Sequence, residues 1–225
     1  MDPGVLPACA TGRMDKGGVR ELFDGLALEY VHERDLQPSF LGQKREVLAL
    51  LDGAGGRLLD IGCGPACMEG DLLSRGFEVV GVDVSLEMLR HGLQRLRAHP
   101  FGHRCRLELG DVERLGFRDA SFDAVICMGV LEYLPAYDRA ISEIYRVLRP
   151  GGVAVATVPN RLSPRHVAGA AARLAKRALG RPREYVPNRC IPWRMARQLR
   201  RQGFHLLAHR YCGTQFIVSA TRERL

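Results

Sequence analysis

The sequence lacks an apolar run of the length that a membrane-spanning helix needs, which is about 18 to 20 residues. Hydrophobic residues make up 46% of its 225 positions, yet no uninterrupted stretch approaches that length. Met1 to Gly18 also lacks the charged end, apolar stretch and cleavage site of a secretory signal. We therefore expect no membrane span, a cytoplasmic location and a flexible tail at residues 1–18.

Clustered cysteines are also missing. The seven cysteines stand singly, apart from Cys63 and Cys67, and most fall in apolar stretches, as buried reduced thiols do. The spacing of Cys63 and Cys67 begins the three-cysteine iron–sulfur motif of radical enzymes, but Gly70 stands where the third cysteine belongs. No cysteine or histidine set has the paired spacing of a zinc site, so the sequence predicts no metal.

Acidic residues are scarce in one part of the chain. From Arg161 to Arg210 there are thirteen Lys or Arg residues and one acid, Glu184, although the whole chain carries a net charge of only +8. Such a segment suits phosphate, lipid headgroups or RNA, or is simply a solvated surface. We expect residues 161–192 to form a basic, lid-like insertion. Its amphipathic part, residues 164–180, either packs on the domain or makes peripheral contact with an anionic membrane.

Short apolar runs alternate with helix-like segments over the rest of the chain. Near-continuous apolar runs are typical of strands covered on both faces of a parallel sheet, and such runs occupy Arg57–Gly62, Glu78–Ser85, Cys105–Asp111, Phe122–Met128 and Val153–Pro159. Helical spacing of apolar residues marks Val19–Tyr30, Gln43–Leu51, Ser85–Ala98 and Tyr137–Leu148. Two final strands, Phe204–Cys212 and Gln215–Thr221, read as a hairpin. We therefore predict one α/β domain over residues 19–225.

Polar residues follow the first three predicted strands where each of them ends. Gly62 and Gly64 allow a sharp turn and close approach of a ligand to the backbone, directly after Asp60. Asp83 comes about twenty residues later, where a ribose diol is gripped in nucleotide-binding folds. Asp111 ends the third strand, where an acid can accept a hydrogen bond from an adenine amine. Taken singly, the glycines also fit a plain strand-to-helix turn, and Asp83 fits a favourable charge at a helix N-terminus.

Five segments in order resemble the class I S-adenosylmethionine-dependent methyltransferases, in particular the small-molecule group that includes the quinone-biosynthesis enzymes. The segments are Asp60–Ala66 (DIGCGPA), Gly81–Leu89 (GVDVSLEML), Gly110–Phe117 (GDVERLGF), Phe122–Leu134 (FDAVICMGVLEYL) and Glu143–Gly152 (EIYRVLRPGG). The resemblance spans residues 22–221. It implies a Rossmann-like, seven-stranded, mostly parallel sheet with an antiparallel last strand and helices on both faces. It also implies S-adenosylmethionine as methyl donor, S-adenosylhomocysteine as product, and a monomer or homodimer.

The resemblance also assigns roles to individual positions. It places Asp60, Gly62 and Gly64 against the methionine moiety and Asp83 on the ribose hydroxyls. Val84, Met88, Asp111 and Val112 would contact the adenine, and Cys127 and Met128 would lie beside the sulfonium. A basic residue before the first strand would meet the cofactor carboxylate. The implied cofactor-binding residues are Asp60, Gly62, Cys63, Gly64, Asp83, Val84, Met88, Asp111, Val112, Cys127, Met128 and Arg45, with Lys44 as the alternative to Arg45. Ala66 departs from the pattern, because the loop usually carries a third glycine there. A small alanine still fits methyltransferases, and it weakens the alternative of a nicotinamide dinucleotide enzyme.

Methyl transfer is expected to be an in-line displacement onto an oxygen or nitrogen atom of a small molecule, with phenolic, prenylated and secondary-metabolite acceptors as candidates. Tyr133 and His166 are the candidate catalytic residues lining the acceptor pocket, although packing or surface roles suit them too. One alternative is a tRNA or rRNA methyltransferase. Against nucleic acid, the sequence has no RNA-binding module, and Cys127–Val130 stands where base-amine enzymes carry Asn-Pro-Pro-Tyr. The other alternative is a non-catalytic partner protein that binds S-adenosylmethionine.

Overall fold

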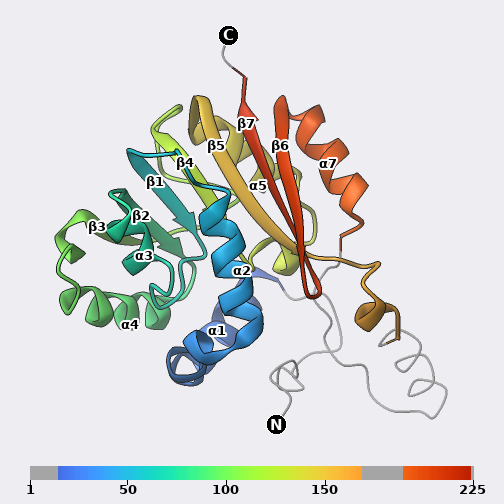
Figure 1. Cartoon of the computed structure of the whole chain (residues 1–225). Coiled ribbons are helices and arrows are strands. Elements are labelled where there is room, and N and C mark those ends of the chain that lie inside the picture. Colours follow the sequence, from blue (N-terminus) through green and yellow to red (C-terminus); the bar gives the residue numbers. More distant parts are fainter. Residues whose placement is uncertain (1–14, 169–189, 224–225) are drawn as a thin grey trace, which may run out of the picture.

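The computed structural model describes residues 15–168 and 190–223. These residues form one seven-stranded sheet with helices on both of its faces (Figure 1). The strand order is β3-β2-β1-β4-β5-β7-β6. The strands are β1 (Arg57–Ile61), β2 (Glu78–Asp83), β3 (Cys105–Leu109), β4 (Phe122–Cys127), β5 (Leu148–Pro159), β6 (Phe204–Cys212) and β7 (Gln215–Arg222). The helices are α1 (Lys16–Glu33), α2 (Pro38–Ala49), α3 (Glu69–Ser74), α4 (Leu86–Arg97), α5 (Asp138–Val147) and α7 (Pro192–Arg201).

The sheet is parallel except at its last strand. β3, β2, β1, β4 and β5 pair in parallel, whereas β7 runs antiparallel between β5 and β6. The predicted Rossmann-like fold with an antiparallel last strand is therefore confirmed. The chain starts in the middle with β1, moves outward to β3, and returns to β4 on the other side of β1. Ligands bind in open α/β sheets at the carboxyl ends of the strands beside such a reversal, here between β1 and β4.

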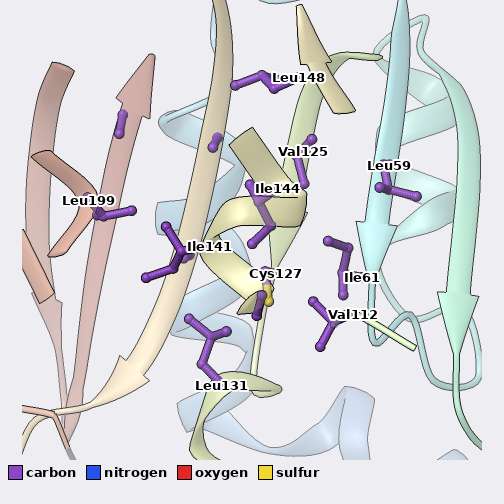
Figure 2. Packing of buried hydrophobic residues seen from close by; sticks show 14 of the residues in the cluster. Leu59, Ile61, Val112, Val125, Cys127, Leu131, Ile141, Ile144, Leu148 and Leu199 are labelled. Atoms are coloured by element: carbon purple, nitrogen blue, oxygen red, sulfur yellow. The ribbon is translucent and has the colours of Figure 1, made fainter. Parts of the chain in front are cut away.

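The central strands are apolar on both faces because each face is covered by helices. Leu59 and Ile61 of β1 pack on the face that carries α5 and α7, whereas Leu58 points to the opposite face with α2, α3 and α4. This alternation follows the two-residue period of a strand. Figure 2 shows the first cluster, in which Ile141 and Ile144 of α5 pack across the strands.

Several elements depart from the prediction: α2 begins at Pro38, before the predicted Gln43, and α3 and α7 were not predicted. The fifth strand begins at Leu148, before the predicted Val153, because Leu148 already pairs with Phe122 of β4. Helix α1 begins at Lys16, inside the range expected for the tail, because the Asp15 carboxylate caps it by accepting a hydrogen bond of 2.8 Å from the Gly18 amide.

The predicted basic insertion lies mostly outside the described residues. A helix starts after Ser163, and residues 164–168 belong to it; the remaining part of the expected stripe at 164–180, like the tail at residues 1–14, is not described. Within the two described ranges, no helix combines the length and the apolar character that crossing a bilayer requires.

Candidate functional site

A cavity of about 330 Å³ lies at the carboxyl ends of β1, β2 and β4, with α1 forming part of its wall. This volume is within the usual range of small-molecule sites. The sheet register explains why distant motifs meet here, because Ile61 at the end of β1 pairs with both Val82 and Cys127. The predicted site residues that line the cavity are Asp60, Gly62, Cys63, Gly64, Asp83, Val84, Met88, Asp111, Val112, Met128 and Tyr133.

The glycine loop after β1 turns through left-handed backbone conformations. Gly62 has a φ of 73° and Gly64 a φ of 54°, both in the region that glycine adopts at low cost. Ala66, at the position of the usual third glycine, has a φ of 58°. A Cβ atom on Gly92 of α4 would lie 3.3 Å from the Ala66 Cβ. A glycine on the facing helix thus leaves room for the alanine in the loop.

Asp83, at the end of β2, fixes this loop. One of its carboxylate oxygens accepts a hydrogen bond of 2.9 Å from the Gly64 amide, and the other accepts one of 2.9 Å from the Ser85 amide. Burial raises the pKa of Asp83, and these hydrogen bonds oppose that rise. A carboxylate has about four lone-pair sites, so it can hold both amides and still accept from a ligand.

A second acid lies behind Asp60. The side chains of Asp60 and Glu69 are 2% and 0% exposed. Glu69 Oε2 accepts a hydrogen bond of 3.1 Å from the Met68 amide, whereas Oε1 has no hydrogen-bond partner among the described residues. Burial raises the pKa of Glu69 to about 7 and raises the pKa of Asp60 as well, the latter also because of the neighbouring Glu69. The two carboxyls therefore hold a proton between them near neutral pH. Sequence analysis missed Glu69, whose only signal is its place just after the glycine loop.

Glu69→Gln is expected to flatten the pH dependence of stability. The folded-state pKa of Glu69 lies above its ordinary value of 4.5, so its contribution is fully present below pH 4.5 and is lost as the pH rises through about 7. The loss is at most about 3 kcal/mol in unfolding free energy. Urea denaturation at pH 5.5 and pH 8 measures the difference, which should be smaller in the variant. Glu78→Gln, at the exposed start of β2, is the matched control. An unchanged pH dependence in Glu69→Gln would contradict the assignment.

Helix α1 is tied over the adenine side of the predicted site. Lys16 Nζ lies 2.5 Å from Asp111 Oδ2 and 2.7 Å from Glu113 Oε2. Further along the helix, Asp24 Oδ1 accepts a hydrogen bond of 2.6 Å from Ser85 Oγ. Ser85 also caps α4 by accepting a hydrogen bond from the Met88 amide. α1 is thereby held against the ends of the strands.

The other half of the cavity is aromatic and carries one cation. Phe23 of α1 meets Tyr133 edge-on at a ring distance of 5.1 Å. The Arg34 guanidinium lies over the rings of Tyr30 and Phe40, at 5.0 Å and 4.4 Å from their centroids. All five side chains line the cavity. Tyr133 was the residue of this wall chosen from the sequence; the other four lie on α1, on α2 and in the turn between them.

Comparison with known proteins decides the class. Residues 59–156 match the family model described as a methyltransferase domain. The chain contains a methyltransferase domain. A demethylmenaquinone methyltransferase of Symbiobacterium thermophilum is 34% identical over 158 residues, which cover 68% of this chain and 62% of that protein. A ubiquinone biosynthesis O-methyltransferase of Psychrobacter cryohalolentis is 28% identical over 137 residues, which cover 60% and 53%. The chain thus spans less than two thirds of the length of these curated relatives.

The fold of this methyltransferase domain has close counterparts among solved structures. The magnesium protoporphyrin IX methyltransferase of Synechocystis PCC 6803, solved with bound S-adenosylhomocysteine, superposes with a TM-score of 0.76 at 18% identity, covering 93% of this chain and 100% of that one. The predicted resemblance to methyltransferases is therefore confirmed.

Four residues predicted for the site do not line the cavity. The Arg45 side chain is 81% exposed and points away from it, and Lys44 instead bonds the Cys67 carbonyl and pairs with Asp71. Cys127 is buried in the core against α5, since strand alternation turns Met128, not Cys127, toward the cavity. His166 Nδ1 lies 2.7 Å from the Asn160 carbonyl oxygen, away from the cavity wall. Arg34, unlike Arg45, lines the cavity.

Proposed function

We propose that this chain transfers the methyl group of S-adenosylmethionine to an oxygen or nitrogen atom of a small aromatic molecule, such as a phenolic or prenylated ring. The observation that carries the proposal is the division of one cavity into two halves. One half holds the glycine loop, Asp83 and Asp111, and the other presents aromatic side chains. Relatives named for demethylmenaquinone and for ubiquinone biosynthesis support a quinone-like acceptor.

The residues of the first half fit an S-adenosyl group. The glycines leave space that a Cβ would fill, Asp83 can accept from the ribose hydroxyls, and Asp111 with Val84, Met88 and Val112 suits the adenine. Asp60 of this half and Arg34 of the aromatic half carry charges that match the amino group and the carboxylate of the methionine end. The bound cofactor supplies a methyl group activated by a positively charged sulfur.

The protein's own contribution is to position the acceptor and exclude water. Phe23 and Tyr133 form one side of the acceptor half, and α1 encloses it. Holding two reactants in line can contribute about 7–11 kcal/mol to lowering the barrier. This geometry favours in-line displacement.

The test combines binding with turnover. The purified protein is first titrated calorimetrically with S-adenosylmethionine, then incubated with it and a panel of catechols, hydroquinones and prenylated phenols while S-adenosylhomocysteine is quantified by mass spectrometry. We expect cofactor binding, and product formation that depends on the acceptor. Turnover of tRNA or rRNA alone would support the nucleic-acid alternative, whose binding falls steeply with salt. Tight cofactor binding with no turnover of any acceptor would overturn the enzymatic proposal in favour of a partner protein.

A further inference from the structure

The segment that joins β3 to β4, residues 110–121, forms part of the cavity wall although it is neither helix nor strand. Its first three residues line the cavity, and a tight turn follows in which the Arg114 amide donates a hydrogen bond of 2.9 Å to the Asp111 carbonyl. The Glu113 amide donates one of 2.9 Å to Asp111 Oδ1. The direction of the Asp111 carboxylate therefore depends on whatever holds this turn in place.

Two side chains of α5, Glu143 and Arg146, hold the chain directly after the turn. The Leu115 amide donates a hydrogen bond of 2.7 Å to Glu143 Oε2, and the Leu115 carbonyl accepts one of 3.0 Å from Arg146 Nη2. Arg146 Nη1 donates to the Phe117 carbonyl at 2.6 Å and to Asp119 Oδ1 at 2.8 Å. Two more hydrogen bonds, of 2.7 and 2.8 Å, join Arg146 to both oxygens of Glu143. Each N–H group of the guanidinium thus has an acceptor.

The clamp formed by Glu143 and Arg146 is partly shielded from water and lies outside the cavity wall. The two side chains are 19% and 29% exposed, and neither lines the cavity. The hydrogen bonds from Arg146 lower the pKa of Glu143 below its ordinary value of 4.5, so the pair is ionised at neutral pH. A lysine ammonium carries all of its donors on one atom and cannot reach the same set of acceptors. The clamp therefore depends on an arginine.

We propose that Glu143 and Arg146 are positioning residues that aim the Asp111 carboxylate at the adenine amine of S-adenosylmethionine. Because they fix Leu115, only the short turn separates the clamped chain from β3. Val112, inside that turn, is buried in the core cluster of Figure 2 and also lines the cavity, so a shift of the turn moves the wall of the site. The inference rests on the proposed function, since it takes the adenine to lie at Asp111, and it names what holds that contact in place.

Lys16 also contacts the Asp111 carboxylate, but it does not replace the clamp. Its Nζ atom lies 2.5 Å from Asp111 Oδ2, and its side chain is 55% exposed. Exposed ion pairs of this kind contribute little to holding a geometry. A carboxylate has about four lone-pair sites, so contacts to Lys16 and to the Glu113 amide leave Asp111 able to accept from an amine.

Arg149 supplies a matched control three residues beyond Arg146. Its guanidinium donates to the Ala120 carbonyl at 3.2 Å and to Asp123 Oδ1 at 2.6 Å. It thus ties down the far end of the same segment, next to β4 and away from the turn. Arg149→Lys removes comparable hydrogen bonds, so an effect shared by both variants reports general loosening of the fold. An effect confined to Arg146→Lys reports the position of Asp111.

The selectivity between two ligands measures that position. S-Adenosylhomocysteine carries the amino group of adenine, and S-inosylhomocysteine carries an oxo group in its place. We expect the wild type to bind the first about 10- to 100-fold more tightly, the equivalent of one hydrogen bond to a charged group. In Arg146→Lys this ratio should fall to about threefold or less, and in Arg149→Lys it should stay as in the wild type. Isothermal titration calorimetry gives the affinities, and circular dichroism establishes that each variant is folded.

A double-variant cycle links the effect to Asp111. Asp111→Ala alone should weaken binding of S-adenosylhomocysteine, and adding Arg146→Lys should weaken it little further, because the group that Arg146 positions is already absent. Fully additive losses would contradict the clamp.

Two further measurements apply if Arg146→Lys does not fold. Glu143→Gln keeps an acceptor for the Leu115 amide but removes the charge that holds Arg146, and its ratio should fall in the same direction. In the wild type, amide hydrogen exchange of residues 110–119 should slow more with S-adenosylhomocysteine than with S-inosylhomocysteine. Equal slowing with the two ligands would count against the clamp.

Three results would overturn the inference. They are a folded Arg146→Lys variant with the wild-type ratio, an equal fall in the ratio of Arg149→Lys, and a wild type that binds both ligands with the same affinity. Any of these together with methylation of an acceptor would reject the clamp and retain the proposed function. The expected ratios without methylation of any acceptor would retain the clamp and reject the proposed transfer, so the two failures are distinguishable.

Discussion

Replacing Asp83 with alanine is expected to weaken S-adenosylmethionine binding by at least about 100-fold. The change removes the proposed acceptor for the ribose hydroxyls and also the carboxylate that holds the Gly64 and Ser85 amides. Hydrogen bonds to a charged group are worth roughly 1.5–3 kcal/mol each, and 1.4 kcal/mol is a factor of ten in affinity. Isothermal titration calorimetry measures the change directly.

Two further variants separate the parts of this effect. Asp83→Asn keeps one acceptor oxygen and should bind more weakly than the wild type but better than Asp83→Ala. Asp52→Ala, a matched loss of an exposed acid that pairs with Arg75, should bind the cofactor like the wild type. Near-normal affinity in a folded Asp83→Ala protein would contradict the placement of the cofactor across the end of β2.

Gly62→Ala is expected to reduce stability by about 2–5 kcal/mol and to impair cofactor binding as well. An L-residue at the φ of 73° costs roughly 1–2 kcal/mol, and overpacking adds about 1–3 kcal/mol. The new Cβ would lie within 2.1 Å of Val130 Cγ2, so Val130 must move into the cavity or the loop must shift. Urea denaturation monitored by circular dichroism gives the loss in unfolding free energy.

The matched comparison for this prediction is Gly64→Ala. Gly64 has a similar φ of 54°, but a Cβ there would meet nothing within 4 Å, so only the backbone cost applies. Combining Gly62→Ala with Val130→Ala should likewise recover the part of the loss that is due to crowding. Equal losses for the two single variants, with no recovery in the double variant, would show that contact with Val130 does not limit the loop.

Residues that line the cavity could be predicted from the sequence where an acidic residue stands at the end of a predicted strand. Asp60, Asp83 and Asp111 each follow an apolar run, and parallel strands bring such ends to one edge of the sheet, so their convergence could be predicted. The hairpin of β6 and β7 was predicted for a similar local reason.

The sequence could not show which side chains point into the cavity where that orientation depends on tertiary packing. Cys127 and Met128 lie in an apolar run with helices on both faces, so hydrophobicity does not show which of them turns to the cavity. Arg34 and Arg45 are both basic residues before β1, and only the turn between α1 and α2 brings Arg34 inward. Glu69 and Glu132 carry no local sign of burial, because an acid is ordinarily a surface residue.

Helix α1 belongs to both halves of the cavity at once. Its first turn, through Lys16, is tied to Asp111 on the adenine side, and its later turns supply Phe23 and Tyr30 to the aromatic wall. Any displacement of α1 from the strand ends would therefore alter both halves of the cavity together. Under the proposed function, the same helix would enclose the methyl donor and complete the surface for the acceptor, so the two sites would not form independently of each other.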